Sequence, residues 1–191
     1  LVKHELRKLG FNTPLIADIH FNPNAALEAA KYVEKIRINP GNYSDKRLLT
    51  DRFDYTDDEY LADLEKAEER ILPLLEICGK NNVAILIGVN HGSLSDRIMS
   101  RYGDTPLGMA QSAMEFLKIC AKHNFHSIVV IMKSSNTRIM VQATRTLAIL
   151  MDKEGMSYPF HLGVTEAGEG EDGRIKSAVG IGALLADGIG D

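Results

Sequence analysis

The chain has 191 residues, and its 22 Lys and Arg against 26 Asp and Glu give a formal net charge of −4. This balance does not supply the basic surface on which nucleic-acid binding depends. Apolar residues make up 45% and charged residues 25%, which excludes intrinsic disorder and is typical of a globular domain with a sizeable core. No apolar run approaches the ~20 residues of a membrane-spanning helix, and no secretory signal pattern occurs, so we expect a cytoplasmic protein.

Short apolar runs alternate with longer stretches of helical period, a pattern that indicates repeated βα units around a parallel sheet. The runs lack polar alternation, as strands covered on both faces do. We expect strands over residues 14–19, 35–38, 83–89, 127–132 and 159–165, with a sixth beginning at Ile189.

Capping residues and prolines mark where the helices begin. The pairs Asn22-Pro23 and Thr105-Pro106 each put a capping side chain before a proline at the first helical position. Apolar residues spaced three and four apart then define buried stripes. The last predicted stripe consists of Ile175, Ala178, Val179 and Gly182.

Residues 44–70 interrupt the alternation with an acidic, helix-forming insertion between two neighbouring strands. The sequence Thr56-Asp57-Asp58-Glu59 is a capping-box pattern that predicts a helix start. We expect Pro73 to kink or restart this helix. The acidic run is interpreted as a solvated outer face, with a partner-binding surface as the alternative.

The chain contains only two cysteines, Cys78 and Cys120, and both fall within helical patterns. This fits buried thiols in a reducing compartment better than a disulfide framework. Two thiols alone cannot ligate a metal cluster, and the histidines outside the strand ends show no metal-ligand spacing. We therefore expect no metal site and no cofactor site in this chain.

Every predicted strand ends in hydrogen-bonding or ionisable residues. The carboxyl ends of parallel strands lie on one side of a sheet, so these side chains converge there. We call this end of the sheet the mouth. A (β/α)₈ barrel builds its active site in this way, and an open α/β sheet builds its ligand crevice likewise. The converging residues are Asp18, His20, Arg37, Asn39, Asn42, Asn90, Ser93, Lys133 and Glu166.

His20, Lys133 and Glu166 are the strongest candidates, because each follows an apolar strand without an adjacent opposite charge. For Asp18 and Asn42 the alternative is a role as a helix cap. The composition of residues 39–42 also predicts a turn, whatever else these residues do.

Five ordered motifs are similar to those of the hydroxymethylbutenyl diphosphate synthases, the IspG (GcpE) family of the methylerythritol phosphate route to isoprenoids. In chain order they are ADIHF (17–21), RINPGN (37–42), GVNHGSL (88–94), MKSSN (132–136) and HLGVTEAG (161–168). The insertion and the sequence NHGSLSDR (90–97) resemble the longer form found in plant plastids and some bacterial groups.

The resemblance implies a two-domain iron–sulfur enzyme. It reductively opens the ring of methylerythritol cyclodiphosphate with two electrons from ferredoxin or flavodoxin, and it releases water. The expected fold is therefore α/β of the (β/α)₈ TIM-barrel type, with residues 1–191 as an incomplete barrel of about five to six βα units. The [4Fe-4S] cluster belongs to a carboxy-terminal domain outside this chain. We expect a bacterial cytoplasmic or plastid stromal protein that can form a homodimer, with no nucleic-acid or membrane partner.

By resemblance, one group of residues surrounds the reacting carbons and hydroxyl: Asp18, Asn90 and Glu166. A second group holds the substrate and its cyclic diphosphate: His20, Arg37, Asn39, Asn42, Ser93 and Lys133. A compact anion of this kind suits a guanidinium and an ammonium that converge from different strands. A glutamate with a raised pKa suits proton delivery to a leaving hydroxyl.

Leu86 stands where the family usually places an arginine, and its apolar side chain cannot donate a hydrogen bond to a phosphate oxygen. Two alternative functions follow. The first is another phosphate-handling barrel, such as a pterin-condensing synthase of the dihydropteroate type. The second is a non-catalytic remnant or binding module.

Overall fold

The computed structural model describes residues 1–19, 21–43 and 54–191. Its centre is a parallel sheet in which neighbours along the chain are neighbours in space, in the order β1-β2-β3-β4. The strands are β1 (Ile16–Ile19), β2 (Lys35–Ile38), β3 (Ala84–Asn90) and β4 (Ile128–Lys133). Four predicted strands are thus confirmed, in the sequential order of a barrel wall.

The fifth predicted strand is reduced to one bridge, in which Phe160 pairs in parallel with Val130 of β4. The prediction of a strand over 159–165 is therefore wrong in its extent. The structure pairs only one edge of this segment, and Gly163 has no side chain to pack there. The predicted strand at Ile189 is not formed in the described residues, although the backbone N–H of Asp191 donates to the Phe160 carbonyl at 3.2 Å.

The helices begin where the capping residues predict. Asn22 accepts from the backbone of α2, Thr105 from that of α6, and Thr56 forms the complete capping box of α4. Pro73 does not restart α4, which is assigned as one helix through it. The described helices are α1 (Val2–Lys8), α2 (Pro23–Ala29), α3 (Pro40–Tyr43), α4 (Asp57–Asn81), α5 (Asp96–Tyr102), α6 (Pro106–Lys122), α7 (Thr137–Lys153) and α8 (Gly170–Ala186). None of them is long and apolar enough to cross a membrane.

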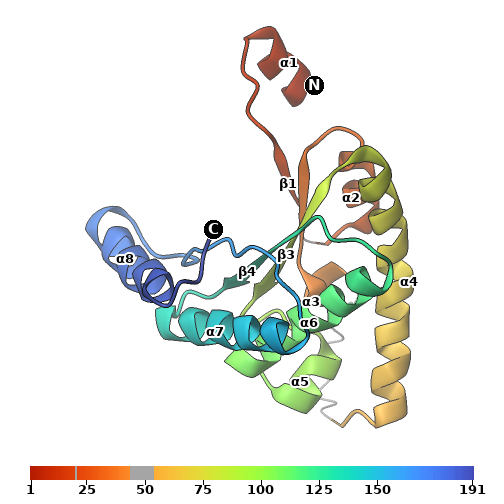
Figure 1. Cartoon of the computed structure of the whole chain (residues 1–191), viewed down its shortest axis with the longest axis vertical. Helices are drawn as coiled ribbons and strands as arrows, with labels where there is room; N and C mark the ends of the chain where they lie inside the picture. The colour runs from red at the N-terminus through yellow and green to blue at the C-terminus, as the bar shows by residue number, and fades with distance from the viewer. Residues whose placement is uncertain (20, 44–53) are drawn as a thin grey trace.

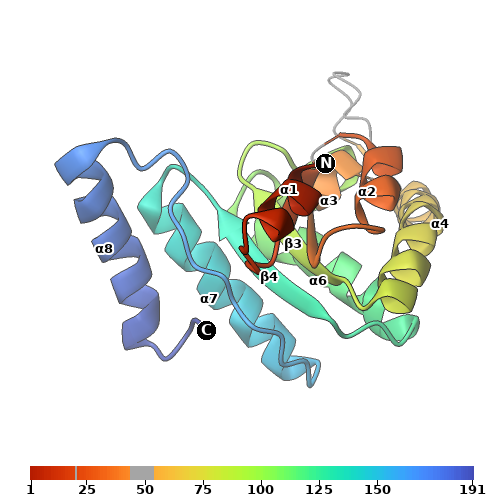
Figure 2. The same ribbon diagram turned by 90° about the horizontal axis from the view of Figure 1, so that it is seen from above.

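Helices cover one face of the sheet, with α4, α6 and α7 along it and α8 at one end (Figures 1 and 2). Alternate strand residues such as Ile36, Ile85 and Val130 are fully buried on this face in one continuous core. The opposite face, here called the inner face, carries the other alternate residues, among them Arg37 and Leu86. The strand order leaves the sheet open in the described residues, which is compatible with part of a barrel wall.

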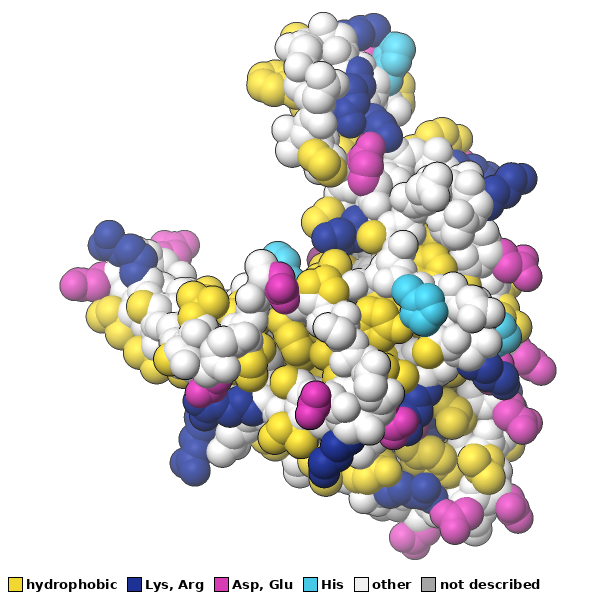
Figure 3. All heavy atoms as spheres, viewed as in Figure 1, with side chains coloured by type: hydrophobic (Ala, Val, Ile, Leu, Met, Phe, Trp, Pro, Cys, Tyr) yellow, Lys and Arg dark blue, Asp and Glu magenta, His cyan; other side chains and the backbone are white. Residues whose placement is uncertain are grey.

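Helix α8 packs on α7 through a face that the periodicity did not predict. Gly180 and Leu184 are buried, whereas Ile175 and Val179 of the predicted stripe are 55% and 60% exposed. A Cβ on Gly180 would come within 2.8 Å of the Met140 side chain, so glycine is what permits the close approach. Apolar residues occur on several sides of α8, and spacing alone cannot choose among them. Figure 3 shows apolar side chains along the outside of this helix.

Candidate functional site

Arg37 joins two of the predicted site residues at the carboxyl end of the sheet. Its guanidinium donates to Asp18 Oδ1 of β1 at 3.0 Å and to Asn90 Oδ1 of β3 at 2.8 Å. It also donates to the Gly88 carbonyl at 3.1 Å. Arg37 is 2% exposed, whereas the Asp18 side chain is 55% exposed. The guanidinium therefore holds a carboxylate and an amide side by side, with the carboxylate open to solvent.

Gly88 makes room for this arrangement. A Cβ at Gly88 would lie 2.5 Å from Arg37 Nε, far inside van der Waals contact. The guanidinium can therefore cross β3 only because residue 88 has no side chain. The motif that contains Gly88 does not reveal this role, although a glycine inside an otherwise apolar strand is a signal of a close approach.

A second set of contacts locks the loop after β2 to the loop after β3. Asn39 is fully buried; its Nδ2 donates to Ser93 Oγ at 2.8 Å, and its Oδ1 accepts from the Gly41 backbone N–H at 3.3 Å. Ser93 Oγ in turn donates to the Asn90 carbonyl at 3.3 Å. The two loops touch, because a Cβ on Gly41 would lie 2.0 Å from the Ser93 carbonyl oxygen.

Lys133 adds a second cation next to Arg37, Asp18 and Asn90. It pairs in register with Asn90, and its carbonyl accepts from the His91 backbone N–H at 2.9 Å. Burial, followed by the positive charge of Arg37, lowers the pKa of the Lys133 ammonium, while the Asp18 carboxylate opposes that shift. No hydrogen bond or ion pair joins this ammonium to another described residue. Lys133 is thus available to an anionic ligand.

Glu166 makes no hydrogen bond or ion pair with the described side chains of the other candidate site residues. Its side chain is exposed and forms no hydrogen bond or ion pair with any part of the chain that the structure describes. Its backbone, however, has φ +52°, a left-handed conformation that is rare outside glycine and is found at turns and functional sites. The residue lies six positions after Phe160, beyond the carboxyl end of β4.

The other predicted positions are less informative. Asn42 lies in α3, and its backbone N–H donates to the Asn39 carbonyl at 3.0 Å, as in the predicted turn. No hydrogen bond joins the Asn42 side chain to another described residue. His20 lies outside the described residues.

Asp104 fastens the β3–α5 turn from its other side, a contact that sequence analysis missed. Its Oδ1 accepts from the Gly92 backbone N–H at 3.1 Å and lies 3.6 Å from His91 Nε2. An aspartate twelve residues beyond the turn gives no local signal of this role.

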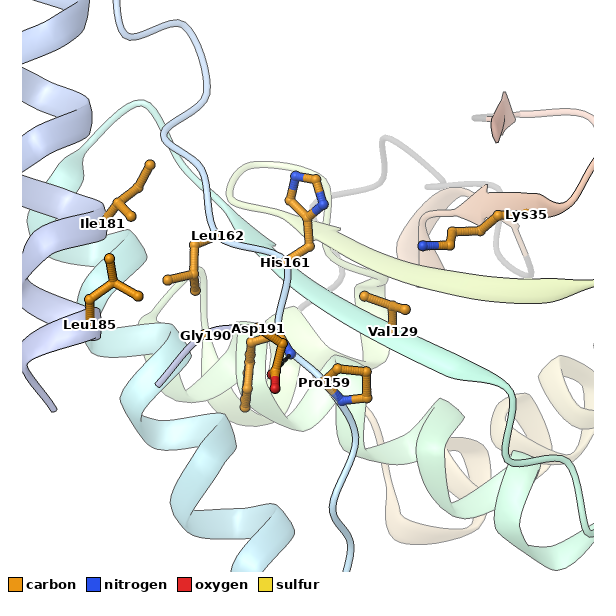
Figure 4. A pocket seen from close by; sticks show the side chains of 10 residues that line it. Lys35, Val129, Pro159, His161, Leu162, Ile181, Leu185, Gly190 and Asp191 are labelled. Carbon is orange, nitrogen blue, oxygen red and sulfur yellow. Dashed lines mark hydrogen bonds between the residues drawn. The ribbon is translucent and has the colours of Figure 1, made fainter. Parts of the chain in front are cut away.

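A cavity of about 460 Å³ opens lower on the inner face and is lined by none of the predicted site residues (Figure 4). Lys35 points into it from β2, and His161 borders it from the segment after α7. The rest of its lining is mainly apolar, including Val129 and Leu162. Lys35 is two residues before Arg37, which places the cavity below the carboxyl end of the sheet.

The cysteines lie away from the mouth, in the helices α4 and α6. Both Cys78 and Cys120 are fully buried, and burial raises the pKa of each thiol to about 12. They are therefore protonated near neutral pH and behave as core residues.

The carboxyl ends of the four parallel strands combine an exposed carboxylate, an amide, a buried guanidinium and an ammonium that has no partner among the described residues. The cations favour a compact anion such as a phosphate ester. The carboxylate and amide provide acid–base and hydrogen-bonding groups next to it. This combination is typical of a barrel-type enzyme site that takes a phosphorylated small molecule.

Comparison with known proteins identifies the family. Residues 2–191 match the model of the GcpE TIM-barrel domain, so the chain belongs to that family and its fold is part of a TIM barrel. It is 62% identical over 190 residues to the 4-hydroxy-3-methylbut-2-en-1-yl diphosphate synthase (flavodoxin) of Parabacteroides distasonis, covering 100% of this chain and 31% of the relative.

Two further relatives carry similar names. The Bacteroides fragilis synthase (flavodoxin) is 61% identical over 186 residues, which is 97% of this chain and 30% of the relative. The chloroplastic synthase (ferredoxin) of Arabidopsis thaliana is 56% identical over 190 residues, which is 100% of this chain and 26% of the relative. The chain thus spans less than a third of the length of these relatives.

Proposed function

We propose that this chain is part of the substrate-binding barrel of a 4-hydroxy-3-methylbut-2-en-1-yl diphosphate synthase. The complete protein would reductively open the ring of 2-C-methyl-D-erythritol 2,4-cyclodiphosphate, consume two electrons from a flavodoxin or a ferredoxin, and release water. The single observation that carries the proposal is the convergence of Asp18, Arg37, Asn90 and Lys133 at one end of the sheet in a chain of this family.

Lys133 is the proposed primary contact of the cyclic diphosphate. Its ammonium is close to Arg37 and Asp18, and it is unpaired among the described residues. Arg37 adds positive charge, but its guanidinium already serves Asp18 and Asn90. We therefore assign Arg37 mainly to orientation of these two groups. The remaining proposed substrate ligands are His20, Asn39, Asn42 and Ser93.

Glu166 is the proposed proton donor for the departing hydroxyl, with Asp18 and Asn90 next to the reacting carbons. Loss of a hydroxyl as water requires a proton, and a carboxylic acid within hydrogen-bond reach can supply it. Two features support Glu166: it follows the last strand-like segment, and its left-handed backbone is held where small neighbours leave space for a ligand.

In this proposal a [4Fe-4S] cluster supplies the electrons, and its ligands lie outside these 191 residues. Cys78 and Cys120 do not fit that role, because they are buried on helices and their thiols stay protonated. The barrel residues bind and orient the substrate and protonate its departing hydroxyl. The bacterial and chloroplastic relatives favour a bacterial cytoplasm or a plastid stroma as the compartment.

The test is an anaerobic assay of the full-length protein, loaded with its cluster, with the cyclic diphosphate and reduced flavodoxin or ferredoxin. We expect conversion to 4-hydroxy-3-methylbut-2-enyl diphosphate with two electrons consumed per product. A cluster-loaded protein that leaves this substrate unchanged but condenses a pterin diphosphate would establish the dihydropteroate-type alternative. A protein that binds neither compound would be a non-catalytic remnant.

A further inference from the structure

Helix α5 begins directly after the turn that carries two of the site residues. Asn90 ends β3, Ser93 bonds to Asn39 across the loops, and Ser95 is already the N-cap residue of α5. Leu94 between them is buried in the core. Any shift of α5 is therefore passed to Asn90 and Ser93 through a short, packed connection.

Helix α5 has only seven residues, too few to fix its own position. It is held by a buried ion pair with α6, in which Arg97 Nη2 lies 2.7 Å and Nε 3.2 Å from Glu115 Oε2. The Arg97 side chain is 2% exposed and the Glu115 side chain 10% exposed. The stability of such a pair depends strongly on complete hydrogen bonding, because buried charges have lost the stabilising contacts of water.

The insertion helix α4 completes this bonding. The Tyr60 hydroxyl donates to the other Glu115 oxygen, Oε1. Burial and the Glu115 carboxylate raise the pKa of this phenol, so it remains a donor. The Arg101 guanidinium of α5 lies 3.9 Å from the centre of the Tyr60 ring and also pairs with Asp57, at the start of α4.

We propose that Tyr60 of the insertion helix is a positioning residue for the site: through Glu115 and Arg97 it fixes α5, and through α5 it fixes Asn90 and Ser93. The inference rests on the proposed function, because the site served is the proposed substrate mouth. It gives the predicted insertion a part in the reaction, beyond the solvated outer face predicted for its acidic run.

The test uses the full-length, cluster-loaded protein with Tyr60→Phe, which removes one hydroxyl and keeps the ring under Arg101. Tyr158→Phe is the matched control, since its hydroxyl bonds His126 at 3.0 Å far from the turn. We expect Tyr60→Phe to lower kcat/KM roughly tenfold, as a misplaced catalytic group does, and Tyr158→Phe to change it less than about twofold.

Amide hydrogen exchange over residues 90–95 supplies a readout independent of turnover. Exchange there should accelerate in Tyr60→Phe and stay unchanged in Tyr158→Phe, even if both variants lose similar melting temperature. Should Tyr60→Phe not fold, Arg101→Lys, at a half-exposed position, is expected to give the same two effects more weakly.

Normal kcat/KM together with unchanged exchange over residues 90–95 in the folded variant would overturn the inference. The proposed function is judged separately, by whether the wild-type protein turns over the cyclic diphosphate. Without that turnover, faster exchange at 90–95 would still support the link from Tyr60 to the turn, and unchanged exchange would reject it.

Discussion

At the scale of single residues, the two cations Arg37 and Lys133 differ in their partners. Arg37 is almost completely buried and donates to Asp18, Asn90 and Gly88. Lys133 is less buried and has no such acceptors among the described residues. A guanidinium already committed to protein acceptors orients them, whereas an unpaired ammonium can take a ligand phosphate. We therefore propose that Arg37 orients Asp18 and Asn90, and that Lys133 binds the diphosphate.

The lowered pKa of Lys133 predicts how substrate affinity depends on pH. The free ammonium loses its proton below the ordinary lysine value of 10.5, so the cyclic diphosphate should bind more weakly as pH rises through that lowered range. Lys133→Arg keeps its charge there and should lose this alkaline decline. Binding titrations of the full-length protein from neutral to alkaline pH measure both. Parallel pH curves for the two proteins would show that another group is responsible.

Glu166→Gln tests whether Glu166 is the proton donor in the cluster-loaded, full-length protein. Glutamine keeps the shape and most hydrogen bonding but carries no transferable proton. Substrate affinity should survive, and turnover should fall by roughly 10²–10⁴-fold, the range for loss of a general acid. If Glu166 only anchors its loop, melting temperature falls instead and turnover stays near normal. That result would make Asp18 the better acid candidate.

At the scale of elements, the strands and the mouth could be predicted because they depend on local patterns. Continuous apolar runs located β1 to β4, and parallel topology then placed their polar ends together. The segment after Pro159 misled the prediction, because apolar character does not reveal whether a partner strand lies on each side. A glycine inside an apolar strand indicates a close approach at Gly88, but its partner could not be predicted, since that depends on where Arg37 reaches from the neighbouring strand.

Gly88→Ala tests how closely β2 and β3 are fitted. The added methyl group would meet Arg37 Nε at 2.5 Å and push the guanidinium away from Asn90. We expect a loss of about 1–3 kcal/mol in the free energy of unfolding, typical of overpacking, and a clear loss of turnover. Gly79→Ala is the control, because nothing lies within 4 Å of a Cβ there. Equal stability and activity of Gly88→Ala and Gly79→Ala would show that Arg37 does not need the space at residue 88.

At the scale of the whole molecule, the chain supplies an arc of a barrel whose complete form takes about 250 residues. Its open inner face carries the candidate site, and its two thiols are in the helical layer. Anaerobic reconstitution of this 191-residue chain with iron and sulfide should therefore yield no stoichiometric iron–sulfur absorbance, while the full-length protein should yield it. A stable cluster on the short chain would mean that Cys78 or Cys120 is a ligand.

The central claim is that the cyclic diphosphate binds at the carboxyl ends of these strands, against Lys133. Its most direct test is calorimetric titration of that substrate into full-length protein carrying Lys133→Met. Lys118→Met is the matched control, because Lys118 lies on the outer helix α6 and pairs with Glu154 at 2.7 Å. We expect Lys133→Met to weaken the affinity about 10–150-fold, equivalent to the roughly 1.5–3 kcal/mol of a charged hydrogen bond, and Lys118→Met to leave it unchanged. Wild-type affinity in Lys133→Met would contradict the central claim.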